Sequence, residues 1–136
     1  RISNGCVLWR RTMNYPTTYE EALAFESHVA QLVAVNMHNS TKERSAETLS
    51  HLHSIKALLP PGLYRHFKGG EYEVIKVFED VNTGICFVEY VAHYGIYNGE
   101  PGARVLVGKD SFLRPIDRPT YRGVRFVRLS ADVLEI

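Results

Sequence analysis

The sequence has few cysteines, no long apolar run and almost no net charge. Only Cys6 and Cys86 occur among its 136 residues, which excludes the dense disulfide framework of small secreted modules and favours a reducing compartment. Polar residues at Glu26, Gln31 and Asn36 interrupt the richest apolar segment, so no stretch reaches the roughly 18 to 20 apolar residues of a membrane span. With 45% hydrophobic and 23% charged residues, the composition is that of one globular domain with or without an appendage.

Catalytic and metal-binding motifs are also scarce. The sequence contains no glycine-rich phosphate loop, no serine elbow and no cysteine pair at metal-binding spacing. His51 and His53 lie two residues apart on a predicted helix, so their side chains point about 200° apart and cannot share a metal without other ligands. We therefore expect no cofactor, no metal site and no catalytic residue, and we expect that the protein is not an enzyme.

The first half of the chain predicts two helices. Thr18 and Glu21 have the spacing of a capping box, and apolar residues then recur about every 3.6 residues, which predicts a helix from about residue 17 to 36–40. Ser45 is the candidate cap of a second helix that must stop at Pro60. Together they predict a helical hairpin with an apolar stripe formed by Phe25, Val29, Leu32, Leu49, Leu52 and Ile55.

From Gly62 onwards the periodicity is that of strands. Alternation over 71–78, a turn at 80–84 and a β-branched and aromatic run over 85–91 predict a β-hairpin. Further short strands are predicted at 104–107, 111–115 and 125–129. Short strands without intervening helices are typical of a small antiparallel barrel, so the predicted fold class is α+β, with a helical hairpin followed by an SH3-like barrel.

These elements predict three parts of the chain. Residues 1–61 are expected to form an N-terminal arm and the helical hairpin, residues 62–129 the β-barrel domain, and residues 130–136 a C-terminal tail. The two-proline step between the first two parts is too short for a flexible linker, so we expect them to pack together. The strand pattern predicts a core that contains Phe67, Val74, Val77, Phe87, Val91 and Phe126.

Positive charge is concentrated near the C-terminus. Residues 104–128 hold seven lysines and arginines against two aspartates, and such a surplus can attract phosphate or an acidic partner. The candidate nucleic-acid contacts are Arg114, Arg118, Arg122, Arg125 and Arg128. The alternative is a solvated strand face, which is the usual place for arginine.

The segment from Tyr64 to Gly70 brings aromatic, cationic and glycine residues together before a strand. Arg65 could bind a carboxylate or phosphate, His66 could donate or relay a proton, and Tyr64 could stack or hydrogen-bond. With Tyr94, these residues are the candidate ligand-binding site. In the alternative interpretation, Tyr64 and Phe67 belong to the core while Arg65 and Lys68 extend into water.

The same segment carries a resemblance to a known family. The run Gly62-Leu63-Tyr64-Arg65-His66-Phe67-Lys68-Gly69 and the later Tyr72-Glu73-Val74, Glu89-Tyr90, Tyr94-Gly95, Phe112 and Arg125-Phe126 resemble the bacterial family called domain of unknown function 1653. The resemblance covers about residues 62–129 and implies a compact β-rich barrel-like domain with no established activity. Two other polar signatures of that family, a His-Ser-Glu-Thr turn and a Trp-Val-Arg-Pro strand, are replaced here by Asp80–Thr83 and Val105–Gly108.

The missing signatures, the added helices and a first residue other than methionine, which is typical of a processed product or of part of a longer chain, favour a role as a building block. We therefore expect a non-enzymatic structural subunit of a large mitochondrial assembly, with the mitochondrial ribosome, a ribonucleoprotein, as the first candidate. The expected partners are other protein subunits and RNA, without a membrane span. The alternatives are an accessory subunit of the respiratory chain or ATP synthase, a small-ligand or modified-nucleotide binding domain with or without enzymatic activity, and a cytoplasmic location.

Overall fold

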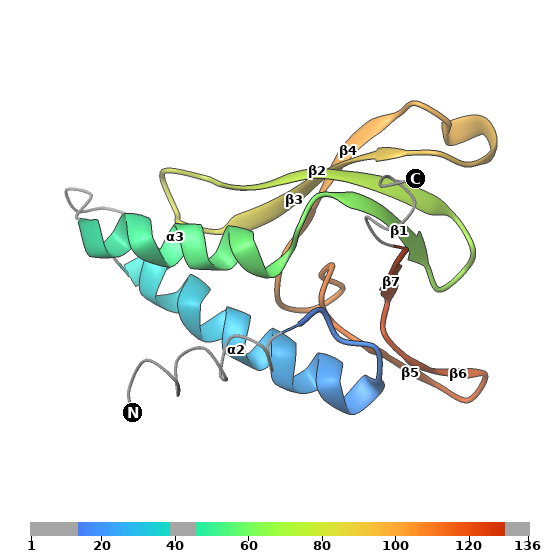
Figure 1. Cartoon of the computed structure of the whole chain (residues 1–136), viewed down its shortest axis with the longest axis horizontal. Helices are drawn as coiled ribbons and strands as arrows, with labels where there is room; N and C mark the ends of the chain where they lie inside the picture. The colour runs from blue at the N-terminus through green and yellow to red at the C-terminus, as the bar shows by residue number, and fades with distance from the viewer. Residues whose placement is uncertain (1–13, 39–45, 130–136) are drawn as a thin grey trace.

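The computed structural model describes residues 14–38 and 46–129, which form an α+β fold. Two helices lie along one face of an antiparallel sheet, and a separate small hairpin extends from one end (Figure 1). In chain order the elements are α2 (Tyr19–His38), α3 (Ala46–Leu58), β1 (Gly62–His66), β2 (Glu71–Glu79), β3 (Cys86–Ala92), the 3-10 turn η1 (Gly95–Tyr97), β4 (Pro101–Val105), β5 (Ile116–Arg118), β6 (Tyr121–Gly123) and β7 (Phe126–Arg128).

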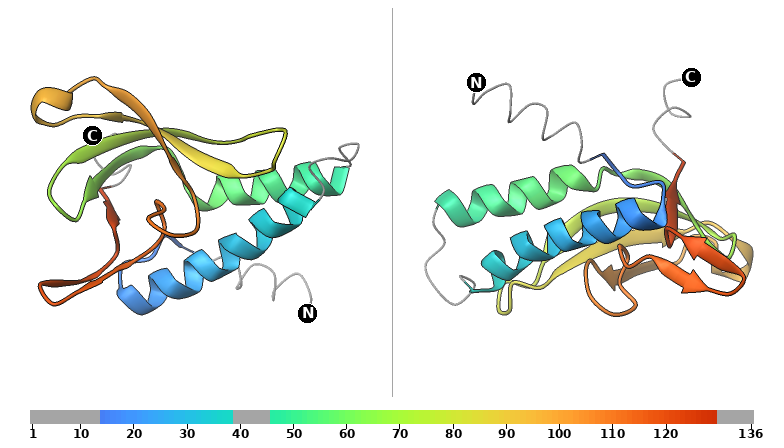
Figure 2. Two further views of the ribbon diagram at one scale, coloured as in Figure 1. Left: turned by 180° about the vertical axis from the view of Figure 1, so that it is seen from behind. Right: turned by 90° about the horizontal axis from the view of Figure 1, so that it is seen from below.

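Both helices begin and end close to the predicted positions. At the start of α2 the Glu21 N–H donates to Thr18 Oγ1 at 3.1 Å, and the Glu21 carboxylate accepts from the Thr17 N–H at 3.0 Å, which satisfies donors that a helix start leaves open. Helix α3 ends at Leu58, ahead of Pro60. The two helices pack side by side (Figure 2). The segment that joins them lies outside the described residues, so the helical hairpin stays a prediction.

The five-stranded sheet has the order β4-β3-β2-β1-β7 and is not closed into a barrel. The predicted SH3-like barrel is therefore wrong for the described residues, because β4 and β7 are the two edges of the sheet and do not pair. After β4 the chain leaves the sheet and runs as an irregular loop over residues 106–115, where we had predicted a strand at 111–115. It then forms the separate β5–β6 hairpin before it returns to the sheet as β7.

One hydrophobic core joins the helices to the sheet. Phe25, Val29 and Ile55 from the helices pack with buried residues of the strands and of the loop 106–115, so the two main parts predicted from the sequence share their core. The division of the chain into domains stays a prediction. In the described residues no helix has the length and apolar character needed to cross a membrane.

The register of β3 differs from the prediction by one residue. Val74, Val77 and Phe126 are buried as predicted, whereas Phe67, Phe87 and Val91 are only half-buried. The core face of β3 is formed by Cys86, Val88 and Ala92 instead. Phe87 lies on the other face, where its ring stacks on Phe78 of β2 with centroids 5.6 Å apart.

Candidate functional site

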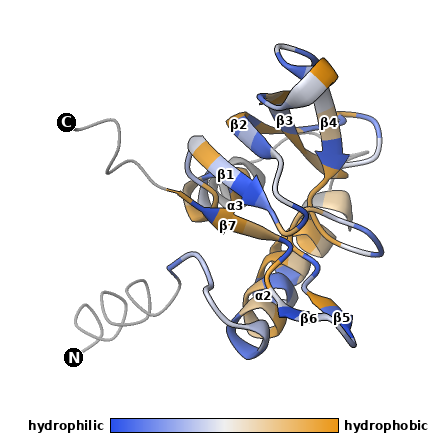
Figure 3. Cartoon of the chain, turned by 90° about the vertical axis from the view of Figure 1, so that its right-hand side faces the viewer, coloured by the Kyte–Doolittle hydropathy of each residue, from blue (hydrophilic) through white to orange (hydrophobic). Residues whose placement is uncertain are grey.

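A pocket of about 410 Å³ lies where the end of β1, the β1–β2 turn and β4 approach the β5–β6 hairpin. Figure 3 faces this end of the molecule, where the ends of β1 and β4 and much of the hairpin consist of hydrophilic residues. The pocket is lined by aromatic residues and cations, and we call it the basic aromatic pocket. Its aromatic residues are His66, Phe67, Tyr72 and Tyr94, its cations are Lys68, Arg104, Arg118 and Arg125, and Gly70 completes it.

The aromatic side of the pocket is held by ring contacts and one hydrogen bond. The hydroxyl groups of Tyr72 and Tyr94 lie 2.9 Å apart, and their ring centroids are 5.4 Å apart. The ring of Phe67 stacks on Tyr121 of β6 at 5.4 Å, with an angle of 18° between the planes. Aromatic side chains that line a pocket can contact a base or another planar group.

Gly70 is required for the close packing of Tyr94. A Cβ atom at residue 70 would lie 2.8 Å from Cδ1 of the Tyr94 ring, which is closer than van der Waals contact allows. The glycine in the β1–β2 turn therefore lets the tyrosine that follows β3 cover this side of the pocket.

His66 presents a neutral ring to the pocket. Partial burial lowers the pKa of His66 to about 4, and the positive charges of Arg104 and Arg125 act in the same direction. The main-chain N–H of Lys68 donates to His66 Nδ1 at 3.2 Å, so in the neutral ring the proton is on Nε2. His66 therefore offers an uncharged N–H donor at neutral pH.

Four cations of the pocket come from four different segments of the chain. Lys68 lies in the β1–β2 turn, Arg104 in β4, Arg118 in β5 and Arg125 just before β7. The guanidinium of Arg118 lies over the Phe67 ring at 5.0 Å, and that of Arg104 lies over the Phe126 ring at 5.7 Å. Burial lowers the pKa of Arg125, and the positive charges of Arg104, Arg118 and Arg114 act in the same direction.

Main-chain carbonyl groups of the loop 106–115 hold two of these arginines. Arg104 Nη1 donates to the Asp110 carbonyl oxygen at 3.0 Å, and Arg125 Nε donates to the Arg114 carbonyl oxygen at 3.1 Å. The Asp110 carboxylate lies 4.0 Å from Arg125 Nη2. Asp110 has a positive φ of 57°, a conformation that aspartate tolerates better than most residues.

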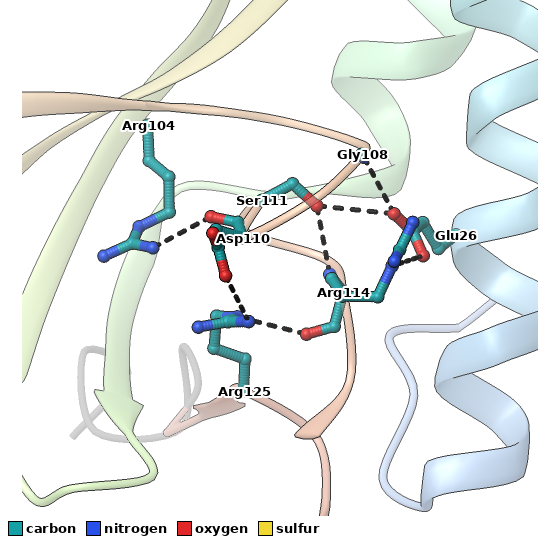
Figure 4. A network of polar contacts seen from close by, with 7 residues as sticks. All are labelled: Glu26, Arg104, Gly108, Asp110, Ser111, Arg114 and Arg125. Atoms are coloured by element: carbon teal, nitrogen blue, oxygen red, sulfur yellow. Dashed lines mark hydrogen bonds and ion pairs between the residues drawn. The ribbon is translucent and has the colours of Figure 1, made fainter. Parts of the chain in front are cut away.

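Helix α2 anchors the same loop through Glu26 (Figure 4). Glu26 Oε2 accepts from the Gly108 N–H at 2.9 Å and from Ser111 Oγ at 3.3 Å, and Glu26 Oε1 accepts from Arg114 Nε at 2.8 Å. Figure 4 shows the loop between the helix on one side and Arg104 and Arg125 on the other. Glu26 thus links α2 to the loop that positions Arg104 and Arg125.

The structure brings together only part of the predicted ligand site. His66 and Tyr94 line the pocket, but Tyr64 is fully buried in the core, where its hydroxyl donates to the Pro60 carbonyl oxygen at 2.6 Å. Arg65 is exposed and donates to the Glu71 carboxylate at 3.2 Å. Because neighbouring residues of a strand point to opposite faces, Arg65 and His66 do not meet.

The five arginines proposed as nucleic-acid contacts have separate surroundings. Arg118 and Arg125 line the pocket. Arg114 pairs with Glu26, and Arg122 pairs with Glu20 at 2.8 Å while its guanidinium lies 3.9 Å from the centre of the Tyr19 ring. Arg128 lies at another hollow of about 380 Å³, lined also by Tyr15, Pro60 and Val127.

Five lining residues of the pocket were absent from the predicted site: Phe67, Lys68, Gly70, Tyr72 and Arg104. Phe67 and Lys68 lie in the same sequence motif as His66 and could have been included on that ground. Tyr72 pairs with Tyr64 across the two strands, so its position depends on the register of the hairpin. Nothing in the local sequence of Arg104 indicates that β4 would bring it to this pocket.

Comparisons with known proteins support the resemblance predicted from the sequence. Residues 62–126 match the model of the family described as protein of unknown function DUF1653, so all lining residues of the basic aromatic pocket lie inside the matched segment, whereas Glu26 lies outside it. A crystal structure of a protein of that family from Bordetella bronchiseptica is similar to this chain at 24% sequence identity and a TM-score of 0.46, over 53% of this chain and 88% of that one. Among curated proteins no match was found.

Proposed function

We propose that the chain is a non-enzymatic binding domain for a nucleotide, either free or as part of RNA. The observation that carries the proposal is the convergence of four cations and four aromatic rings on one pocket. Cations supply attraction for phosphate, and aromatic rings that line a pocket can contact a base. The pocket volume of about 410 Å³ lies within the range of small-molecule sites, roughly 300 to 1,000 Å³.

The chemistry of the pocket favours binding over catalysis. The neutral His66 ring is a donor at Nε2, while its Nδ1 is occupied by the Lys68 N–H. No carboxylate is among the residues that line the pocket. A base that could activate water or a hydroxyl at neutral pH is therefore not part of this set of side chains.

The proposal is tested by removing two cations of the pocket, Lys68 and Arg118. In the described structure their side chains make no hydrogen bond to the main chain. Lys68→Ala combined with Arg118→Ala should weaken binding of ADP or of a short single-stranded RNA by about 10- to 100-fold, because charge-assisted contacts are lost. Binding is measured by calorimetry on the full chain at fixed salt.

A charge-matched double variant provides the control. Arg65→Ala combined with Arg122→Ala removes the same number of positive charges, but both side chains are exposed and pair with glutamates outside the pocket. It should bind like the unchanged protein. Equal losses in the two double variants would mean that general charge, and not the pocket, attracts the ligand.

We further propose that the domain acts as a structural subunit of a mitochondrial assembly, with the ribosome as the first candidate and a respiratory-chain or ATP-synthase complex as the alternative. The observation that favours a partner is a set of apolar side chains exposed on α2: Leu23, Val35 and Met37. A partner that covers α2 would remove these side chains from water.

Sedimentation of native mitochondrial extract, with and without ribonuclease, tests this second proposal. A subunit of a ribonucleoprotein should move to smaller particles after the treatment, whereas a subunit of a respiratory complex should not. A protein that sediments as a free monomer in untreated extract would contradict the role as a subunit.

A further inference from the structure

We infer that the basic aromatic pocket is built for a terminal phosphate group, as in a nucleotide or at a phosphorylated end of RNA, and not for the internal phosphodiester of a continuous strand. This inference rests on the proposed function and specifies its ligand. Three observations support it: the number of cations in the pocket, the orientation of two of its arginines, and the carboxylate partners of several cations outside the pocket.

The charge of the pocket exceeds what one phosphodiester can balance. Lys68, Arg104, Arg118 and Arg125 contribute four positive charges. The nearest carboxylate, that of Asp110, lies at 4.0 Å from Arg125 and has a side chain that is 76% exposed, so solvent screens much of its effect. An internal phosphodiester carries one negative charge, whereas a phosphate monoester carries about 1.5 to 2 at neutral pH and larger phosphate groups carry more.

The arginines are oriented for a group with several acceptor oxygens. Arg104 uses Nη1 for the Asp110 carbonyl, and Arg125 uses Nε for the Arg114 carbonyl. A guanidinium has five N–H donors, so each of the two keeps further donors for a ligand while its plane is fixed by the loop. A terminal phosphate presents three acceptor oxygens to such groups, and the His66 Nε2–H can donate to one of them.

Four of the described cations outside the pocket are paired with a carboxylate. Several cations outside it have a carboxylate partner within 4.0 Å: Arg65 with Glu71, Lys76 with Glu89, Arg114 with Glu26, and Arg122 with Glu20. Proteins that bind a continuous single strand instead present a positive groove that follows the backbone over several nucleotides. Among the described residues, the basic aromatic pocket is thus a place where four cations meet without a carboxylate in the lining.

The experiment compares one short single-stranded RNA in three forms, with hydroxyl groups at both ends, with a 5′-phosphate and with a 3′-phosphate, alongside ADP. We expect ADP and at least one phosphorylated RNA to bind about tenfold or more tightly than the form with hydroxyl ends, since a second charge adds at least one charge-assisted contact. The Lys68→Ala and Arg118→Ala double variant should abolish this difference, and the Arg65→Ala and Arg122→Ala control should retain it.

The outcomes separate the inference from the proposed function. Equal binding of all three RNAs, weakened in the pocket variant, would overturn the preference for a terminal phosphate and leave the proposed function intact. A preference that persists in the pocket variant would overturn the inference as well, because the phosphate would then bind elsewhere. Absence of binding to ADP and to every RNA would overturn both.

Discussion

Replacing Glu26 by glutamine should lower the free energy of unfolding by about 1.5 to 3 kcal/mol, because hydrogen bonds to a charged group are lost in a buried site. The Glu26 carboxylate accepts three hydrogen bonds from the loop, and its side chain is only 9% exposed. An amide can still accept from Gly108 and Ser111, but its NH₂ group cannot accept from Arg114 Nε. Urea unfolding followed by circular dichroism measures the change.

The same substitution should weaken ADP binding in the folded protein. Gly108, Ser111 and Arg114 flank Asp110, and the carbonyl oxygens of Asp110 and Arg114 fix the guanidinium groups of Arg104 and Arg125. A loop released from α2 no longer holds those groups in place. Glu26 is thus a positioning residue that does not itself line the pocket.

Glu20→Gln provides a matched control for this prediction. Glu20 lies on the same helix and pairs with Arg122 at 2.8 Å, but its side chain is 70% exposed. Exposed ion pairs contribute little to stability, so this variant should unfold and bind like the unchanged protein. If Glu26→Gln destabilised the protein but left the ADP affinity of the folded state unchanged, Glu26 would have only a structural role.

Local signals in the sequence were sufficient to predict the two helices and the hairpin of β2 and β3. The Thr18 and Glu21 pair and the proline at 60 act within one or two turns of the chain, so the boundaries of α2 and α3 could be predicted. The turn at residues 80–84 likewise joins β2 to β3, with the Asp80 N–H donating to the Ile85 carbonyl at 2.9 Å. Such features need no knowledge of distant parts of the chain.

The register of β3 could not be predicted from its own residues. The run from Ile85 to Val91 contains large side chains at both odd and even positions, so alternation does not distinguish its two faces. The register is instead set by pairing with β2, which is irregular between Val74 and Lys76. This irregularity also lets Val74 and Val77, three residues apart, both reach the core.

The open form of the sheet and the composition of the pocket depend on contacts between residues far apart in the sequence. The segment 111–115 has the residues of a strand, but Ser111 and Arg114 are bound to Glu26, more than 80 residues earlier in the chain. His66 of the sequence motif lines the pocket, whereas Arg104 and Arg125 reach it only through β4 and the return to β7. No spacing rule in the sequence connects these segments.

Replacing Phe126 by alanine should give the largest loss of stability, about 3 to 5 kcal/mol, which is typical of removing a buried aromatic ring. Phe126 is 1% exposed, and its ring stacks on Phe112 with centroids 4.1 Å apart. It also packs edge-on against His66 at 4.9 Å and Tyr72 at 5.4 Å. One side chain of β7 therefore joins the core to the floor of the pocket.

Two further variants make this prediction specific. Val127→Ala changes the neighbouring residue, which is 43% exposed, so its free energy of unfolding should stay within about 0.5 kcal/mol of the unchanged protein, as for most surface substitutions. Phe126→Leu keeps part of the buried volume and should fold, but it removes the ring beneath the Arg104 guanidinium. ADP should then bind more weakly to the folded Phe126→Leu protein than to Val127→Ala. A loss of less than about 1 kcal/mol in Phe126→Ala would mean that the ring is not a core residue, and normal ADP binding by Phe126→Leu would mean that the aromatic floor does not support the pocket cations.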